Sequence, residues 1–210
     1  MSKKRIVVGI ALNFILLMIL IRGLINILLV EVEDYLGYIL SEITFAQVVA
    51  PMLLAIVVFV YLIALFHELI SGRETPKFIN ALRLIVAVGE LAIFLINFCI
   101  VVPYAGEFSL ANNNAYLLLA IPVMTFISFF PTKYEYSSFG LLYGLIGVIL
   151  YLGAIIALSM MYVINVPYRF LDVYTQEYYK IIINVVIIVA AGSLSTGLLM
   201  LIAKPRYKKS

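Results

Sequence analysis

The chain has 210 residues, of which 65% are hydrophobic and only 12% are charged. Soluble domains carry roughly 25% charged residues, and a water-soluble fold could not bury this much apolar surface. The composition therefore excludes a soluble globular protein and predicts an all-α, polytopic membrane protein, because helices satisfy their backbone polar groups inside lipid. The net charge of +3 comes from basic residues at the ends of apolar runs, so we expect no nucleic-acid partner.

Six apolar runs separated by short polar stretches predict six transmembrane helices in one transmembrane domain covering 1–210. A helix needs roughly 20 apolar residues to cross about 30 Å of hydrocarbon, and every run except the fourth reaches that length. The fourth run contains Pro122 and leaves open a thin crossing or a tucked helix. The expected spans are 6–30, 44–69, 78–102, 115–130, 138–164 and 178–203.

The distribution of lysine and arginine predicts the orientation, because loops rich in these residues stay in the cytoplasm. The side that carries the two termini is strongly basic, whereas the other side holds only Arg169 and Lys180. We therefore expect both termini in the cytoplasm and the chain in a cell membrane of the bacterial inner-membrane type. The residues on the basic side are Lys3, Lys4, Arg5, Arg73, Lys77, Arg83, Lys133, Lys204, Arg206, Lys208 and Lys209.

Two ionisable residues, Arg22 and Glu90, fall inside apolar runs, where such residues usually face the bundle interior or water. Counted from the cytoplasmic ends of their helices, Glu90 lies about 18 Å deep and Arg22 about 24 Å deep. The two helices run the same way, so an Arg22–Glu90 pair is within the reach of an arginine. The alternative for Arg22 is that it extends to the outer headgroups. For Glu90 we expect an interior role, either paired or protonated.

Polar residues at the outer ends of several spans predict an outward-facing polar pocket. Thr44 and Gln47 lie three residues apart and share one helix face. The segment Pro167–Tyr174 packs aromatic rings and opposite charges between two apolar runs, and we expect it to cap the pocket. The alternative is that these residues only mark the membrane interface. Besides Thr44, the residues expected at binding positions are Arg22, Gln47, Glu90, Asn114, Tyr116, Arg169 and Asp172.

Two further patterns favour structural roles over chemistry. With a single histidine and a single cysteine, the chain offers no transition-metal site, and we expect neither a metal nor a cofactor. Gly140 and Gly144 have the spacing that lets membrane helices approach closely, which favours helix packing over a substrate path.

The six-span plan with Pro-Tyr-x-Phe-Leu-Asp-Val at 167–173 before the last helix resembles the bacterial six-helix relatives of the androgen-inducible membrane hydrolase superfamily. In its eukaryotic members an intramembrane threonine and a histidine cleave fatty acid esters of hydroxy fatty acids. The resemblance implies Thr44 as the nucleophile. The histidine expected near the start of the fourth span is absent, and Asn114, Tyr116 and Leu118 occupy that region. A hydroxyl nucleophile needs an adjacent base, so this departure favours a member without hydrolase chemistry.

These observations leave three hypotheses for function. The first is a membrane protein whose outward pocket binds a lipid or amphiphile without intact hydrolase chemistry. The second is a small transporter or channel-like subunit with Arg22 and Glu90 in the path. The third is a lipid-ester hydrolase using Thr44. The expected partners are membrane lipids, together with further copies of this chain or another membrane protein.

Overall fold

The computed structural model is all-α throughout the part of the chain it describes, which confirms the all-α part of the predicted fold class. Five of its helices are long and apolar enough to cross a membrane. They are α1 (Lys3–Leu28), α3 (Ala46–Ser71), α4 (Lys77–Ile96), α8 (Gly140–Met160) and α9 (Tyr178–Ala203). The described residues are 2–28, 46–98, 116–132, 134, 136, 139–161, 171, 174 and 176–204.

The fourth apolar run forms a shorter element. It begins as the π-helix η2 (Tyr116–Ala120) and continues as α7 (Ile121–Ser128). Its apolar helical stretch, Leu117–Ser128, spans only about 18 Å at 1.5 Å per residue, against about 30 Å of hydrocarbon. Pro122 is the second residue of α7, which continues directly from η2, so its missing N–H falls inside a continuous helical stretch. The described helix is therefore too short to cross a bilayer by itself.

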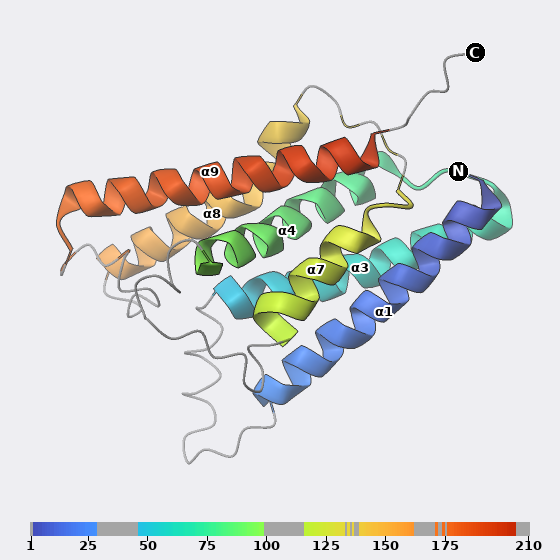
Figure 1. Ribbon diagram of the computed structural model, residues 1–210, viewed down its shortest axis with the longest axis horizontal. Helices are drawn as coiled ribbons and strands as arrows, with labels where there is room; N and C mark the ends of the chain where they lie inside the picture. Colours follow the sequence, from blue (N-terminus) through green and yellow to red (C-terminus); the bar gives the residue numbers. More distant parts are fainter. Residues whose placement is uncertain are drawn as a thin grey trace.

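Helix α4 is the centre of the bundle. It packs on α3, α7, α8 and α9, while α1 packs mainly on α3 and α7. In Figure 1, α4 lies between α8 and α9 on one side and α3 and α7 on the other. More than half of the most apolar window of α4 is buried, a larger share than in the other four long helices. Residues along α4 therefore face several neighbours, and any buried polar group on α4 needs a partner from one of them.

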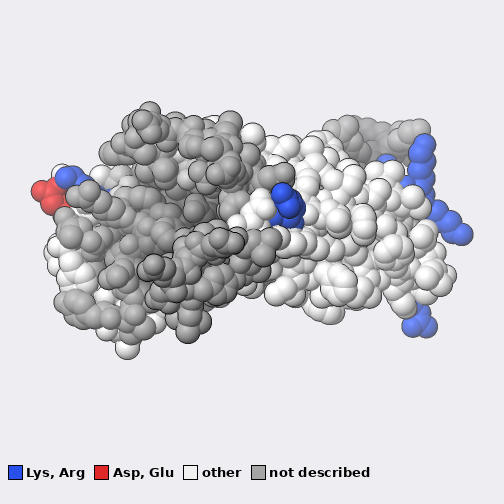
Figure 2. All heavy atoms as spheres, turned by 90° about the horizontal axis from the view of Figure 1, so that it is seen from below, with Lys and Arg blue, Asp and Glu red and all other residues white. Residues whose placement is uncertain are grey.

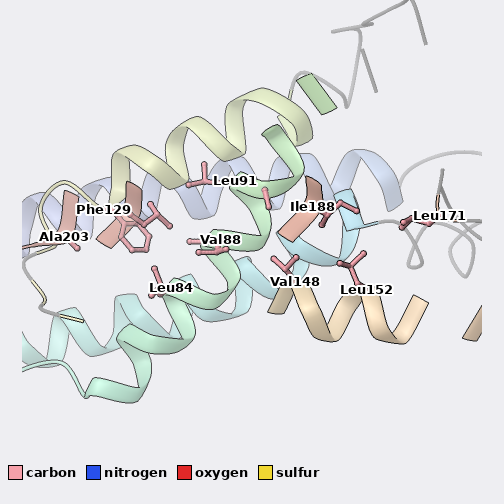
Figure 3. Packing of buried hydrophobic residues seen from close by; sticks show 12 residues of the cluster. Leu84, Val88, Leu91, Phe129, Val148, Leu152, Leu171, Ile188 and Ala203 are labelled. Carbon is pink, nitrogen blue, oxygen red and sulfur yellow. The ribbon is translucent and has the colours of Figure 1, made fainter. Parts of the chain in front are cut away.

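The largest apolar cluster joins α4 to α8 and α9. Leu84, Val88 and Leu91 project from α4, and Val148 and Ile188 approach from α8 and α9 (Figure 3). A second cluster joins α1, α3 and the η2–α7 segment. These contacts stabilise the bundle through close packing of the buried side chains.

The predicted role of the glycine pair in α8 is confirmed by its contacts with α9. A Cβ added at Gly144 would overlap the side chain of Thr196, and one added at Gly140 would lie 2.6 Å from Cε of Met200. Only a residue without a side chain lets the two helices approach this closely. Gly144 therefore fixes the separation of α8 and α9, whereas at Gly140 the close contact is with the flexible end of Met200.

Basic side chains gather at one end of the bundle (Figure 2), which we call the basic end. It is formed by the starts of α1 and α4 and the end of α9, with the exposed residues Lys3, Lys77 and Lys204. At the opposite end, Glu177 and Lys180 form an exposed ion pair at 3.0 Å. The described helix ends thus carry the charge asymmetry seen in the sequence.

The turn between α3 and α4 lies at the basic end and is held by one carboxylate. Glu68 Oε2 accepts hydrogen bonds from the backbone N–H of Thr75 at 3.1 Å and from its Oγ1 at 2.8 Å. Gly72 has φ of 71°, a left-handed conformation that glycine adopts without strain. These features set how α3 folds back along α4.

Candidate functional site

A mostly apolar crevice in the described part of the chain is floored by α4 and walled by α3 and α8. It encloses about 140 Å³, and nearly all of its lining side chains are hydrocarbon. Floor residues such as Val86 and Gly89 are only half-buried, so the crevice opens along the flank of the bundle. Representative lining residues are Val49 and Leu53 on α3, Val86 and Ile93 on α4, and Val148 and Leu152 on α8.

Two glycines shape this crevice. A Cβ added at Gly89 would meet no atom within 4 Å, so the floor is open at this point. A Cβ added at Gly147 would lie 3.0 Å from Cγ2 and 3.4 Å from the carbonyl oxygen of Ile85. The crevice is therefore deep beside Gly89 and pinched where α8 meets α4 at Ile85.

The end of the crevice remote from the basic end carries a polar side chain, Asn97. Its Nδ2 donates to the carbonyl oxygen of Ile93 at 2.9 Å, which fixes the orientation of the amide. Among the described residues no donor to its Oδ1 is found, and the amide is one of the few polar groups that line the crevice. Leu171, from the predicted capping segment, is buried and lines the same end.

A second polar feature, at Arg83, lies in the core between α4 and α7. Arg83 is 1% exposed. Its Nη1 donates to Thr132 Oγ1 at 2.7 Å, and its Nη2 donates to the carbonyl oxygen and the Oγ of Ser128 at 2.8 and 2.9 Å. The guanidinium carbon also lies 4.1 Å from the ring centroids of both Tyr61 and Phe129.

Arg83 forms no ion pair with an acidic side chain among the described residues, so neutral oxygens and two ring faces carry its stabilisation. Guanidinium suits this setting, because it is planar, stacks on rings and presents several donors at once. Nearby, the Tyr136 hydroxyl donates to the carbonyl oxygen of Asn80 at 3.4 Å, and burial raises the pKa of Tyr136 although Arg83 opposes this. The cluster pins the short helix α7 and the turn after it to α4.

The predicted Arg22–Glu90 pair is wrong. Glu90 is 1% exposed and its Oε2 has no hydrogen-bond partner, while Arg22 is exposed on α1. The two residues were matched by depth, but α1 packs mainly on α3 and α7, whereas Glu90 belongs to α4. Similar depth in a bundle does not make two helix faces neighbours.

The remaining predicted site residues have side chains that lie outside the described part of the chain, so their grouping stays a prediction. The backbones of Gln47 and Tyr116 belong to α3 and η2, and their side chains lie outside the described residues. From the predicted cap, the Tyr174 hydroxyl donates to the carbonyl oxygen of Met160 at 3.0 Å, at the end of α8. The predicted ring contacts near Thr44 and Tyr116 lie outside the described residues, as do Thr44, Asn114, Arg169 and Asp172.

Two features of the site were missed by sequence reasoning. In the sequence, Arg83 appears only as one of the basic residues of the cytoplasmic side. It nevertheless lies inside an apolar helix, seven residues before Glu90 and on the same helix face. That position was a usable signal for an interior polar cluster. The sequence carries no comparable signal for the crevice beside Gly89. A glycine in an apolar helix does not show whether the neighbouring helices cover it or leave it open.

Comparison with known proteins gives no match: no protein-family model, no curated protein and no solved structure is similar to this chain. The function is therefore inferred from the chain's own residues. Of the features above, the crevice is open to a ligand and the Arg83 cluster is closed by packing.

Proposed function

We propose that this protein is an integral membrane protein that binds a lipid or another amphiphile. The crevice between α3 and α8 carries the proposal. It opens on the apolar flank of the bundle, where a membrane would place lipid tails, and its lining offers hydrocarbon with the Asn97 amide at one end. Ligand pockets combine a mostly apolar lining with a few placed polar groups in this way.

The membrane setting of the proposal rests on five long apolar helices and on the charge asymmetry between the bundle ends. We place the basic end and both termini in the cytoplasm of a bacterial-type inner membrane. Single cysteines at Ser2 and Thr175, in a Cys99→Ala background, test this orientation with an impermeant thiol reagent on intact cells. Labelling at Thr175 alone is expected, and labelling at Ser2 would reverse the orientation.

Filling the crevice is the direct test of ligand binding. Gly89→Leu places a side chain into the open floor, where no protein atom lies within 4 Å of the new Cβ. Gly153→Leu is the matched control, because Gly153 on α8 also has nothing within 4 Å of an added Cβ but does not line the crevice. Both changes replace a helical glycine, so both raise helix propensity similarly.

The measurement is native mass spectrometry of the purified protein titrated with palmitoyl lysophosphatidylcholine in a mild detergent. Wild type and Gly153→Leu are expected to retain the bound lipid, and Gly89→Leu is expected to lose it. Equal retention by all three proteins would show that the crevice is not the binding site.

A further inference from the structure

We propose that the crevice takes one unbranched acyl tail of a lipid from the leaflet remote from the basic end, and that the contact of Ile85 with Gly147 limits how deep the tail reaches. This inference rests on the proposed function. It adds the class of ligand, its orientation and the residue that sets the length of the tail.

The length of the crevice matches one leaflet. Its floor runs along α4 from Ile85 to Asn97, which is about 18 Å at 1.5 Å per residue. Half of a hydrocarbon core of about 30 Å is about 15 Å. Ile85 itself lies about 12 Å from the start of α4 at Lys77, so the crevice begins near mid-bundle and extends away from the basic end. A lipid tail that follows this path lies mostly in the leaflet remote from the basic end.

The width of the crevice fits one chain. Its enclosed volume of about 140 Å³ is close to that of an apolar cavity of about 150 Å³ that stays dry and holds a benzene-sized molecule. This space takes a segment of one hydrocarbon tail, with the rest of the tail in the lateral opening. Two tails side by side need more room than this volume provides.

The inner end of the crevice is closed by helix contact. Ile85 and Gly147 line the crevice at the point where a Cβ on Gly147 would already be 3.0 Å from the Ile85 side chain. A glycine here lets α8 approach α4 and the isoleucine closes the gap. The Ile85 side chain is therefore the stop that the methyl end of a tail would meet.

The outer end supplies the polarity that orients the lipid. Asn97 lines the crevice there; its Nδ2 donates to the carbonyl oxygen of Ile93, and no described residue donates to its Oδ1. A glycerol hydroxyl or another donor close to a lipid headgroup is the chemistry that this oxygen accepts. The tail then points toward Ile85 and the headgroup lies beside Asn97, at the level of the remote interface.

The tail-length limit is tested with a series of lysophosphatidylcholines carrying decanoyl, lauroyl, myristoyl, palmitoyl or stearoyl tails. In wild type, affinity should rise with tail length up to a limit and then stop rising. Ile85→Ala removes the stop and should move that limit to a longer tail in the series. The control is Ile149→Ala, which removes the same atoms from an exposed position on α8 outside the crevice and should leave the limit unchanged.

Photocrosslinking of the wild-type protein tests the orientation without any substitution. A lysolipid with a diazirine in its headgroup should label the peptide containing Asn97. One with the diazirine at the tail end should label peptides containing Ile85 or Gly147. The reverse pattern would overturn the orientation.

The outcomes separate this inference from the proposed function. Loss of binding in Gly89→Leu together with an unmoved length limit in Ile85→Ala would overturn the acyl-tail stop and leave lipid binding intact. Unchanged binding in Gly89→Leu would overturn both. If the affinity for lysophosphatidylcholine did not depend on tail length, the inference would be wrong, because the tail would not lie in the crevice.

Discussion

Replacing Thr132 by valine removes one hydrogen-bond acceptor of the buried Arg83 and keeps the shape of the side chain. Thr132 is 3% exposed, and its Oγ1 lies 2.7 Å from the donating Nη1 of Arg83. In Thr132→Val that charged N–H loses its partner where water does not reach. We expect a loss of stability, because leaving a buried charged donor unsatisfied costs more than the bond contributes on average.

The magnitude follows from the type of bond. Hydrogen bonds to charged groups contribute about 1.5–3 kcal/mol, so Thr132→Val should lower the free energy of unfolding by about that amount. In an Arg83→Met background the donor is gone, and the same substitution should cost close to nothing. The coupling energy between Arg83 and Thr132 is therefore expected to be about 1.5–3 kcal/mol.

The assay is a double-mutant cycle on reversible unfolding of the purified protein by sodium dodecyl sulfate in mixed micelles, followed by circular dichroism. Ser193→Ala serves as the control, since among the described residues the Ser193 hydroxyl donates to the Val189 carbonyl oxygen within its own helix, α9. It should be additive with Arg83→Met. Additivity of Thr132→Val with Arg83→Met within about 0.5 kcal/mol would refute the argument that this bond holds α7 to α4.

Two further predictions use the same unfolding assay. Gly144→Ala should lower the free energy of unfolding by about 1–3 kcal/mol relative to Gly153→Ala. Both substitutions gain the same helix propensity, but only the Cβ added at Gly144 overlaps Thr196. Equal stability of the two variants would mean that α8 and α9 can separate freely. Glu90→Met should leave stability unchanged or raise it, because it removes a buried oxygen that has no partner; a lower unfolding midpoint would show that the carboxyl makes a stabilising contact.

The amino-acid sequence by itself determined the all-α class and the order of the apolar helices. Both follow from local hydropathy, since each apolar run must satisfy its own backbone polar groups wherever its neighbours lie. The packing role of Gly140 and Gly144 could also be predicted from the sequence, because close approach of helices requires small residues at that spacing. The shortness of the fourth run was visible too, but only the structure showed it as a π-helix followed by α7.

Tertiary structure alone decided which helix faces meet. Arg22 and Glu90 matched in depth yet lie on helices with different neighbours, while Arg83 found its acceptors in Ser128 and Thr132, far along the chain. The crevice exists because α3 and α8 both pack on α4 and leave Gly89 uncovered between them. The periodicity of one helix shows which residues share a face, but the partner of that face depends on the shapes and polar groups of segments distant in sequence.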